Sequence, residues 1–152
     1  MQTGPTMRTR KSQKRYIDGE HGLSTKECPF CDLTNKDPRE IYEETEYFYR
    51  AENIYGYDIW DGHVVSEHQM IVPKRHIATL SEMTHNEDIE YLALLKSAEL
   101  NGYCAYTRGI HGVTKSVAHI HTHLIKLDDE KQIKGLFFNR KPHIVLFRAS
   151  NR

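Results

Sequence analysis

Three histidines occupy alternate positions in this chain, at His119, His121 and His123, within the β-type run AHIHTHLI. Alternate side chains of a strand leave the same face, so we expect the three imidazoles side by side, about 7 Å apart. Ile120 and Leu124 are expected to face a core on the other side. A row of imidazoles contributes little to folding, but each ring can bind a metal ion, move a proton or attack phosphorus. The pattern therefore favours metal binding or phosphoryl chemistry over a merely solvated strand.

A second set of metal-type ligands begins with Cys28 and Cys31. Two thiolates at this spacing can reach one zinc ion, which takes four ligands in structural sites. A redox pair is the alternative, but it requires a strand-to-helix junction in a βαβ unit, whereas polar sequence flanks this pair on both sides. Histidines supply the remaining ligands readily, and His76 and His119 are our candidates, although His119 could instead serve only beside the other triad histidines. Cys104 lies in a predicted strand and is expected to be a small buried residue.

The loop before the histidines contains the groups of an anion site. Residues Gly112–Ser116 offer backbone N–H groups, hydroxyl groups and an ammonium group, and phosphate is the usual anion for such a set. If a metal ion holds His119, His121 and His123 remain for chemistry. A neutral imidazole attacks phosphorus when its other nitrogen donates to a fixed acceptor, and a second imidazole can donate to a phosphate oxygen or the leaving group. These residues predict substitution in two steps through a phospho-histidine.

The elements that must position these groups are short strands and one long helix. Thr84 and Glu87 form a capping box for a helix whose apolar positions recur to about Asn101, and Gly102 ends it. Strands are expected as a hairpin at 41–44 and 47–50, and at 69–72, 103–107, through the histidines to 127, and at 144–147. The pattern predicts an α+β fold with a mainly antiparallel sheet.

Length and composition indicate the domain organisation. A chain of 152 residues fits one domain, and Lys plus Arg equal Asp plus Glu at 21 each, so net charge favours no class of partner. Residues 1–26 form a basic, hydrophobe-poor arm that we expect to be disordered and solubilising rather than a nucleic-acid contact, and residues 27–152 form the domain. The sequence has no apolar run of membrane-spanning length and no signal-peptide core, and its three cysteines do not suit a disulfide scaffold. We expect a cytoplasmic protein without a membrane partner.

Together these motifs resemble the histidine triad (HIT) superfamily, whose motif is His-φ-His-φ-His-φ-φ with φ apolar. The resemblance spans about residues 28 to 127. The matching segments are the triad HIHTHLI, in which Thr122 is the one polar departure; MIVPKRHI, similar to the family's apolar-Pro-Lys-x-His segment; Ser116-Val117 before the triad; and the pair Cys28 and Cys31, which resembles that of the zinc-binding branch.

The resemblance implies a five-stranded antiparallel sheet with one long and one short helix, paired across a homodimer into a ten-stranded sheet. It implies a nucleotide hydrolase or transferase acting at the α-phosphate of a nucleotidyl compound. By position, His121 would be the nucleophile, and His123 would contact the phosphate and assist the leaving group, with His119 completing the triad. Ser116 would hold a phosphate oxygen. A structural zinc ion (Zn²⁺) would be bound by Cys28, Cys31, His76 and His119.

The chain departs from the family pattern where the phosphate is contacted. Lys115 stands where many members have Gln, and Arg108 falls where many have a phosphate-contacting Asn. Two neutral amides have thus become cations, and we hypothesise a preference for an anionic substrate such as a dinucleoside polyphosphate over a nucleoside phosphoramidate. Glu67-His68 replaces the family's Gly-His. The ribose-binding residue therefore has three candidates, Asn53, Asp58 and Asp61. Either Trp60 or Tyr57 would cover the base.

Other functions fit the same residues. Phosphoramidate hydrolysis, phosphorolysis and nucleotidyl transfer differ from polyphosphate hydrolysis in the leaving group or in the acceptor, which one strand does not reveal. A zinc-stabilised nucleotide-binding module with little turnover is the alternative from another class, against which the intact His121 argues.

Overall fold

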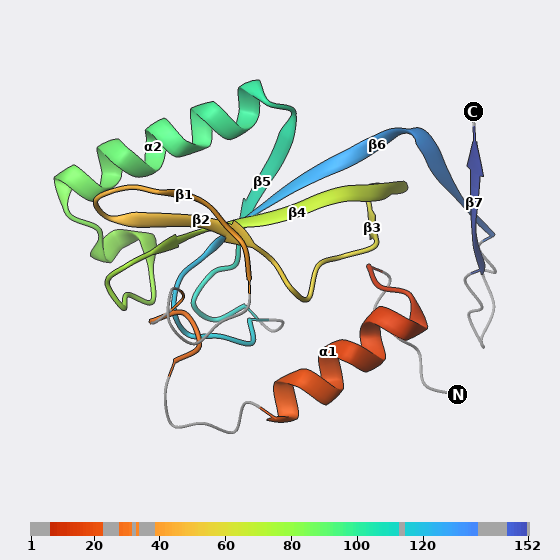
Figure 1. The fold of residues 1–152 in the computed structure, drawn as a ribbon, viewed down its shortest axis with the longest axis horizontal. Coiled ribbons are helices and arrows are strands. Elements are labelled where there is room, and N and C mark those ends of the chain that lie inside the picture. The colour runs from red at the N-terminus through yellow and green to blue at the C-terminus, as the bar shows by residue number, and fades with distance from the viewer. Residues whose placement is uncertain are drawn as a thin grey trace.

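The computed structural model of the chain describes residues 7–22, 28–31, 33, 39–112, 115–136 and 146–151. The expected α+β fold is confirmed, and none of the helices in these residues has the length and apolarity needed to cross a membrane. The elements labelled in Figure 1 are the helices α1 (Arg10–Gly22) and α2 (His85–Leu100) and the strands β1 (Ile41–Glu44), β2 (Phe48–Glu52), β3 (Ile59–Trp60), β4 (His63–Pro73), β5 (Tyr103–Thr107), β6 (Thr122–Leu136) and β7 (Leu146–Asn151), with a 3₁₀ turn η1 at Leu80–Glu82.

The strands form one antiparallel sheet. Its order is β1-β2-β4-β6-β5, with β3 paired to β4 and β7 paired to β6. The predicted hairpin is β1–β2, and the long strands β4 and β6 are neighbours at the centre of the sheet (Figure 1). In their register Met70 lies opposite His123, and His68 lies opposite Ile125. The strand that ends at Pro73 is therefore placed beside the histidine segment.

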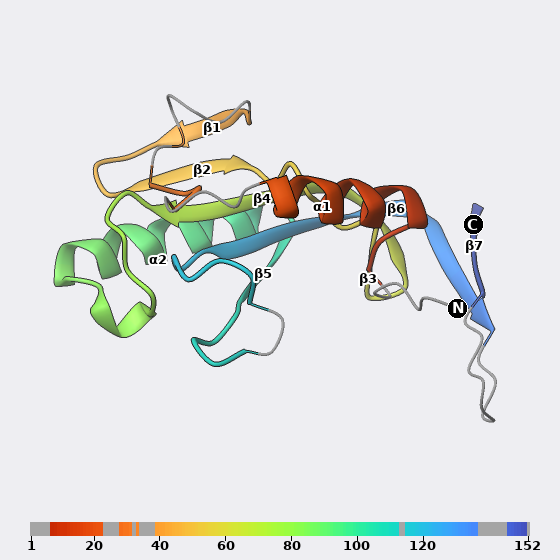
Figure 2. The same cartoon turned by 90° about the horizontal axis from the view of Figure 1, so that it is seen from below.

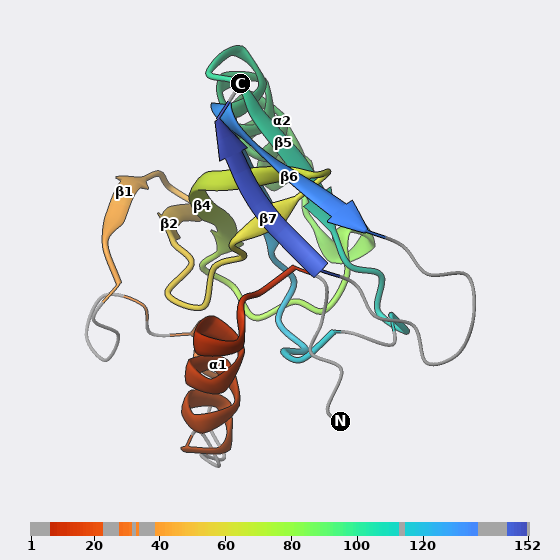
Figure 3. The ribbon, with the colours of Figure 1, turned by 90° about the vertical axis from the view of Figure 1, so that its right-hand side faces the viewer.

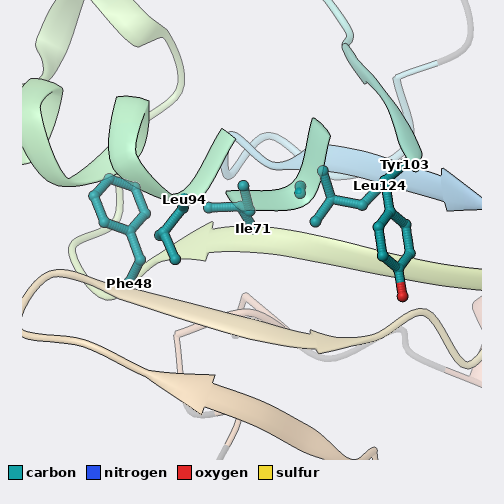
Figure 4. Packing of buried hydrophobic residues seen from close by; sticks show 6 residues of the cluster. Phe48, Ile71, Leu94, Tyr103 and Leu124 are labelled. Carbon is teal, nitrogen blue, oxygen red and sulfur yellow. The ribbon is translucent and has the colours of Figure 1, made fainter. Parts of the chain in front are cut away.

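Helix α2 covers one face of the sheet. The oxygen of Thr84 accepts from the N–H of Glu87, and the Glu87 carboxylate accepts from the N–H of Thr84, so the predicted capping box is confirmed. Gly102, at a φ of +79°, turns the chain from the helix into β5. Figure 4 shows the buried cluster between α2 and the sheet, which consists of Phe48, Ile71, Leu94, Ala98, Tyr103 and Leu124.

The other face of the sheet has its own buried cluster. Met70 and Val72 flank Ile71 in β4, so by strand alternation they point away from α2. They pack with Phe30, Leu33 and Ala51. His123 lies opposite Met70 and next to Leu124, which faces α2, so it belongs to this second face. The sheet thus separates the α2 core from the face that carries the histidines.

Part of the N-terminal arm, for which we expected disorder, is described as a helix. Within residues 1–26, α1 forms over Arg10–Gly22, and residues 1–6 and 23–27 lie outside the described residues. Figures 1 and 3 place α1 on the side of the sheet opposite α2, and Figure 2 shows the same helix in front of the sheet from below. Thr9 caps it by accepting the N–H of Ser12. The sequence did not predict this helix because it lacks an apolar stripe. Contacts with a loop distant in the sequence stabilise it instead.

Three local expectations also change. The strand β6 begins only at Thr122, so His119 and His121 precede it, although Ile120 and Leu124 are buried as expected. Cys104 is exposed rather than buried, because β5 is an edge strand. The final strand, expected at 144–147, is described from Leu146 onward, and residues 144–145 lie outside the described residues.

Candidate functional site

Four metal-type side chains from three separate segments meet in one group. The ligand atoms of Cys28, Cys31, His76 and His119 all lie within 4.8 Å of one another. His76 Nδ1 is 3.1 Å from Cys31 Sγ, and His119 Nδ1 is 3.5 Å from Cys28 Sγ and 3.7 Å from Cys31 Sγ. In a tetrahedral zinc site nitrogen and sulfur ligands are about 3.5 Å apart, as bonds of about 2.0 and 2.3 Å to the metal require. The structure thus brings together the four residues predicted as ligands, in a group that can hold a metal ion.

A main-chain carbonyl orients His119 toward this group. His119 is completely buried, and its Nε2 lies 2.9 Å from the carbonyl oxygen of Pro73. A carbonyl only accepts, so Nε2 carries the proton and Nδ1 presents its lone pair to the two thiols. A hydrogen bond from the remote ring nitrogen is the usual support of a metal-binding histidine. The Pro73 carbonyl at the end of β4 therefore suits His119 to metal binding.

His121 is fixed in the tautomer that a nucleophile needs. Its Nδ1 lies 3.0 Å from the carbonyl oxygen of His119, so Nδ1 carries the proton and Nε2 carries the lone pair. Burial lowers the pKa of His121, and the charges of Lys115, Arg108 and Arg39 lower it further. The ring packs edge-on against Phe30, with centroids 4.9 Å apart. The imidazole is therefore neutral at physiological pH and held in one orientation.

His123 belongs to a hydrogen-bonded chain that the sequence did not reveal. The N–H of Tyr57 donates to Nδ1 of His68 over 2.9 Å, so the proton of neutral His68 lies on Nε2. That Nε2 is 2.9 Å from Nδ1 of His123 and donates to it. The proton of neutral His123 therefore lies on its own Nε2, where it can be donated. Asn53 lies against both rings, with Nδ2 3.2 Å from His68 Nε2 and 3.5 Å from His123 Nδ1.

Burial keeps both members of this histidine pair neutral. It lowers the pKa of His68 to about 3 and that of His123 to about 2, and the positive charges of Arg8 and neighbouring groups contribute to both shifts. The sequence predicted no role for His68 in the site. Alternation along β4 places it on the face of Met70 and Val72, but its contact with His123 depends on the β4–β6 register, which the sequence pattern does not give.

Aromatic rings surround His123. Tyr106 stacks on it, with centroids 4.6 Å apart, and Tyr57 lies 5.8 Å away on a nearly parallel plane. Trp60, delivered by the β3–β4 hairpin, stacks on both Tyr57 and Tyr106 at 5.8 and 5.0 Å. Arg108 donates to the hydroxyl of Tyr57, which in turn lies 2.8 Å from that of Tyr106. Trp60 and Arg108, both predicted from sequence, thus contact Tyr57 and Tyr106, and these two rings pack on His123.

The other residues predicted to contact substrate, Lys115, Ser116 and the ribose candidates, are not among the aromatic rings around His123. Nζ of Lys115 donates to the carbonyl of Ala78, and Ser116 is exposed beside it, while Val113 and Thr114 of the expected anion loop lie outside the described residues. Of the three ribose candidates, Asn53 adjoins the histidine pair. Asp58 instead accepts from the N–H of Thr9 and from the hydroxyl of Ser12, so it holds α1.

Known structures share this fold. No protein-family model matches the sequence, and no curated protein matches it. A HIT family hydrolase from Clostridium thermocellum is 26% identical with a TM-score of 0.52, over 70% of this chain and 95% of that one. A histidine triad nucleotide-binding protein from Candida albicans is 23% identical with a TM-score of 0.51, over 76% and 85%. A member of the HIT family from Bacillus subtilis is 24% identical with a TM-score of 0.51, over 66% and 72%. The chain therefore has the histidine triad fold, and the similarity to the Clostridium thermocellum protein supports its place in the histidine triad superfamily.

Proposed function

We propose that the protein is a nucleotide hydrolase or nucleotidyltransferase that acts at the α-phosphate of a nucleotidyl compound, with dinucleoside polyphosphates as favoured substrates. The hydrogen bond between His121 and the carbonyl of His119 carries the proposal, because it fixes the proton of a buried, neutral imidazole on Nδ1 and leaves the nucleophilic lone pair on Nε2. The Clostridium thermocellum protein of the same fold is described as a hydrolase, which supports the reaction class.

In the first step Nε2 of His121 attacks the α-phosphorus. Its lone pair forms the N–P bond while the bond between phosphorus and the leaving-group oxygen breaks, and that electron pair goes to the leaving oxygen. His123 Nε2–H donates a hydrogen bond to that oxygen or to a phosphate oxygen, because His68 occupies its Nδ1. A neutral donor suits this role, since the pKa of His123 is lowered by burial to about 2.

In the second step water or another acceptor attacks the nucleotidyl-histidine. The acceptor oxygen forms the new bond to phosphorus, the N–P bond breaks, and its electron pair returns to Nε2 of His121. With water as the acceptor the product is a nucleoside monophosphate, and the proton released goes to solvent or to the departed phosphate. Hydrolase and transferase differ only in this acceptor, and water is the acceptor we propose.

Positive charge around the histidines favours a highly charged substrate. Lys115, Arg108 and Arg39 act on His121, and Arg108 and Arg8 act on His123. Lys115 and Arg108 are the positions where the chain departs from the neutral amides of many relatives, and both now have identified neighbours in Ala78 and Tyr57. A polyphosphate presents more charge to these groups than a phosphoramidate does.

Zinc is the metal we propose for the cluster of Cys28, Cys31, His76 and His119. Its mixed sulfur and nitrogen donors and closed set of four ligands fit structural zinc rather than catalytic zinc. The ion would join the cysteine segment to β4 and to the triad, two residues from His121. Free thiols that serve as ligands fit a reducing compartment, and we propose the cytoplasm.

We also propose the homodimer that the resemblance implies. The edge strand β5 is open to pairing at the end of the sheet order. Beside it α2 carries apolar side chains on its outer surface, with Ile89 59%, Leu92 50% and Leu100 83% exposed. A second copy pairing through β5 would cover these residues and extend the sheet.

The test uses diadenosine tetraphosphate and adenosine phosphoramidate with purified protein. Attack at the α-phosphate releases AMP and ATP from the first and AMP from the second, whereas two molecules of ADP would indicate another bond. We expect His121→Ala to lose at least about a thousandfold in kcat/KM, as removal of a nucleophile does. His111→Ala, an exposed histidine before the triad, is the control that retains activity. Nucleotide binding without turnover by the wild-type protein would establish the binding module instead.

A further inference from the structure

The N-terminal segment 7–22 is built onto the loop that supports the histidine pair. The carbonyl of Met7 accepts from the N–H groups of Asp58 and Ile59 at 2.9 and 3.2 Å. In return the Asp58 carboxylate accepts from the N–H of Thr9 at 2.6 Å and from the hydroxyl of Ser12 at 2.9 Å, at the N-terminus of α1. A carboxylate at this end of a helix is favourable both as a cap and toward the helix dipole. These reciprocal bonds place residue 8 at a defined position.

The guanidinium of Arg8 occupies that position between two aromatic rings. Its Cζ is 4.1 Å from the ring centroid of Tyr16 and 4.8 Å from that of Tyr57, and Nη2 donates to the carbonyl of Tyr55 over 2.9 Å. The ring of Tyr57 packs in turn on His68 and His123, with centroids 4.7 and 5.8 Å away. The ring of Tyr57 therefore contacts both the cation of the N-terminal segment and the proton donor of the site.

None of the ion pairs among the described residues includes Arg8, and its buried Nε has no hydrogen-bond partner among the same residues. Arg8 is partly buried, and a guanidinium in such a setting is stabilised by a charge-assisted contact with an anionic ligand nearby. Its charge is felt by both His68 and His123, in addition to burial. The segment thus supplies a positive charge on the His123 side of the site, and that charge has no counter-ion among the described residues.

We propose that residues 7–22 form a specificity element for the leaving group, in which Arg8 attracts the phosphates beyond the scissile bond. The inference rests on the proposed function, in which His121 receives the α-phosphate and His123 meets the leaving group. Arg8 contacts the Tyr57 ring, which packs on His68 and His123, whereas Lys115 donates to the carbonyl of Ala78, so Arg8 lies on the His123 side of the site. Arg8 therefore discriminates between substrates by leaving-group charge.

The experiment compares two substrates with the same adenylyl group. The leaving group of diadenosine tetraphosphate carries a chain of phosphates, and that of adenosine phosphoramidate is ammonia. Arg8→Met retains the apolar stem between the two tyrosines and removes the charge. We expect Arg8→Met to lower kcat/KM for the tetraphosphate about tenfold, as loss of one charged contact does. Its kcat/KM for the phosphoramidate should stay within about twofold of the wild-type value. Arg8→Lys restores most of the loss.

Arg15→Met is the matched control. Arg15 also lies in α1 and also donates to a carbonyl of the same loop, that of Ile54 at 2.7 Å, but it contributes to no pKa shift of the site histidines. Arg15→Met should leave kcat/KM unchanged for both substrates. Equal losses on both substrates for Arg8→Met, or the same loss for Arg15→Met, would overturn the specificity role in favour of a structural one. Failure of the wild-type protein to cleave either substrate would overturn the proposed function itself. Cleavage of the phosphoramidate alone would overturn the role of Arg8 and the proposed preference for dinucleoside polyphosphates, but not attack at the α-phosphate.

Discussion

At the scale of single residues, the pair His68 and His123 gives the protein a particular dependence on pH. In the unfolded chain a histidine binds a proton below its ordinary pKa of about 6.5. In the folded chain burial lowers the pKa of His68 to about 3 and that of His123 to about 2, so the native state remains unprotonated there. The unfolded state therefore binds more protons below pH 6.5, and the free energy of unfolding falls as the pH falls.

The variant His68→Gln tests this linkage. Each such histidine contributes a slope of about 1.4 kcal/mol per pH unit to the free energy of unfolding. Between about pH 6 and about pH 4.5 the slope measured for His68→Gln should therefore be smaller by about that amount. Urea unfolding at a series of pH values measures it. Since metal release at acid pH affects both proteins alike, the difference between them isolates His68. His111→Gln, at an exposed position, should retain the wild-type slope, and an unchanged slope in His68→Gln would contradict the buried neutral state.

At the scale of elements, the metal cluster joins three segments that are far apart in the sequence. Cys28 and Cys31 come from before the sheet, His76 follows β4, and His119 precedes β6. We expect Cys28→Ala to lose its zinc and to melt at least about 10 °C lower, because a structural zinc ion contributes several kcal/mol and each kcal/mol moves Tm by roughly 2–4 °C in a domain of this size. Metal analysis and thermal unfolding check both effects.

Cys104→Ala is the matched control for the metal prediction. Cys104 is also a free cysteine, but it lies in β5, outside the cluster. It should keep one zinc ion per chain and the wild-type Tm. If Cys28→Ala kept both as well, the cluster would not be a zinc site.

The same scale explains what could be predicted from the sequence. Local patterns found α2, the β1–β2 hairpin and the four members of the metal cluster, because caps, alternation and Cys-x-x-Cys spacing are short-range signals. His68 and Arg8 were missed because their roles depend on partners 55 and 47 residues away. Such contacts arise from strand register and from the packing of α1, and a local sequence pattern predicts neither.

At the scale of the whole molecule, α2 has two apolar sides where one would suffice for a monomer. Leu94 and Ala98 face the core, while Ile89, Leu92 and Leu100 lie at helical spacing on the outer side and are exposed. An outer apolar stripe next to an open edge strand is typical of an interface. The proposed homodimer accounts for both features.

The prediction for the assembly is therefore that the chain sediments as a dimer and that Leu92→Glu makes it a monomer. A carboxylate at the centre of the stripe would be desolvated without a partner, at a cost of several kcal/mol, which is enough to dissociate a micromolar dimer. Leu80→Glu is the control, because Leu80 is 41% exposed in η1, away from the outer stripe of α2, and should remain dimeric. Sedimentation equilibrium measures both variants, and circular dichroism establishes that Leu92→Glu is folded. A wild-type monomer would contradict the proposed dimer, and a dimer that survives Leu92→Glu would place the interface elsewhere. A folded monomer that still cleaves the nucleotide would show that each chain contains a complete site.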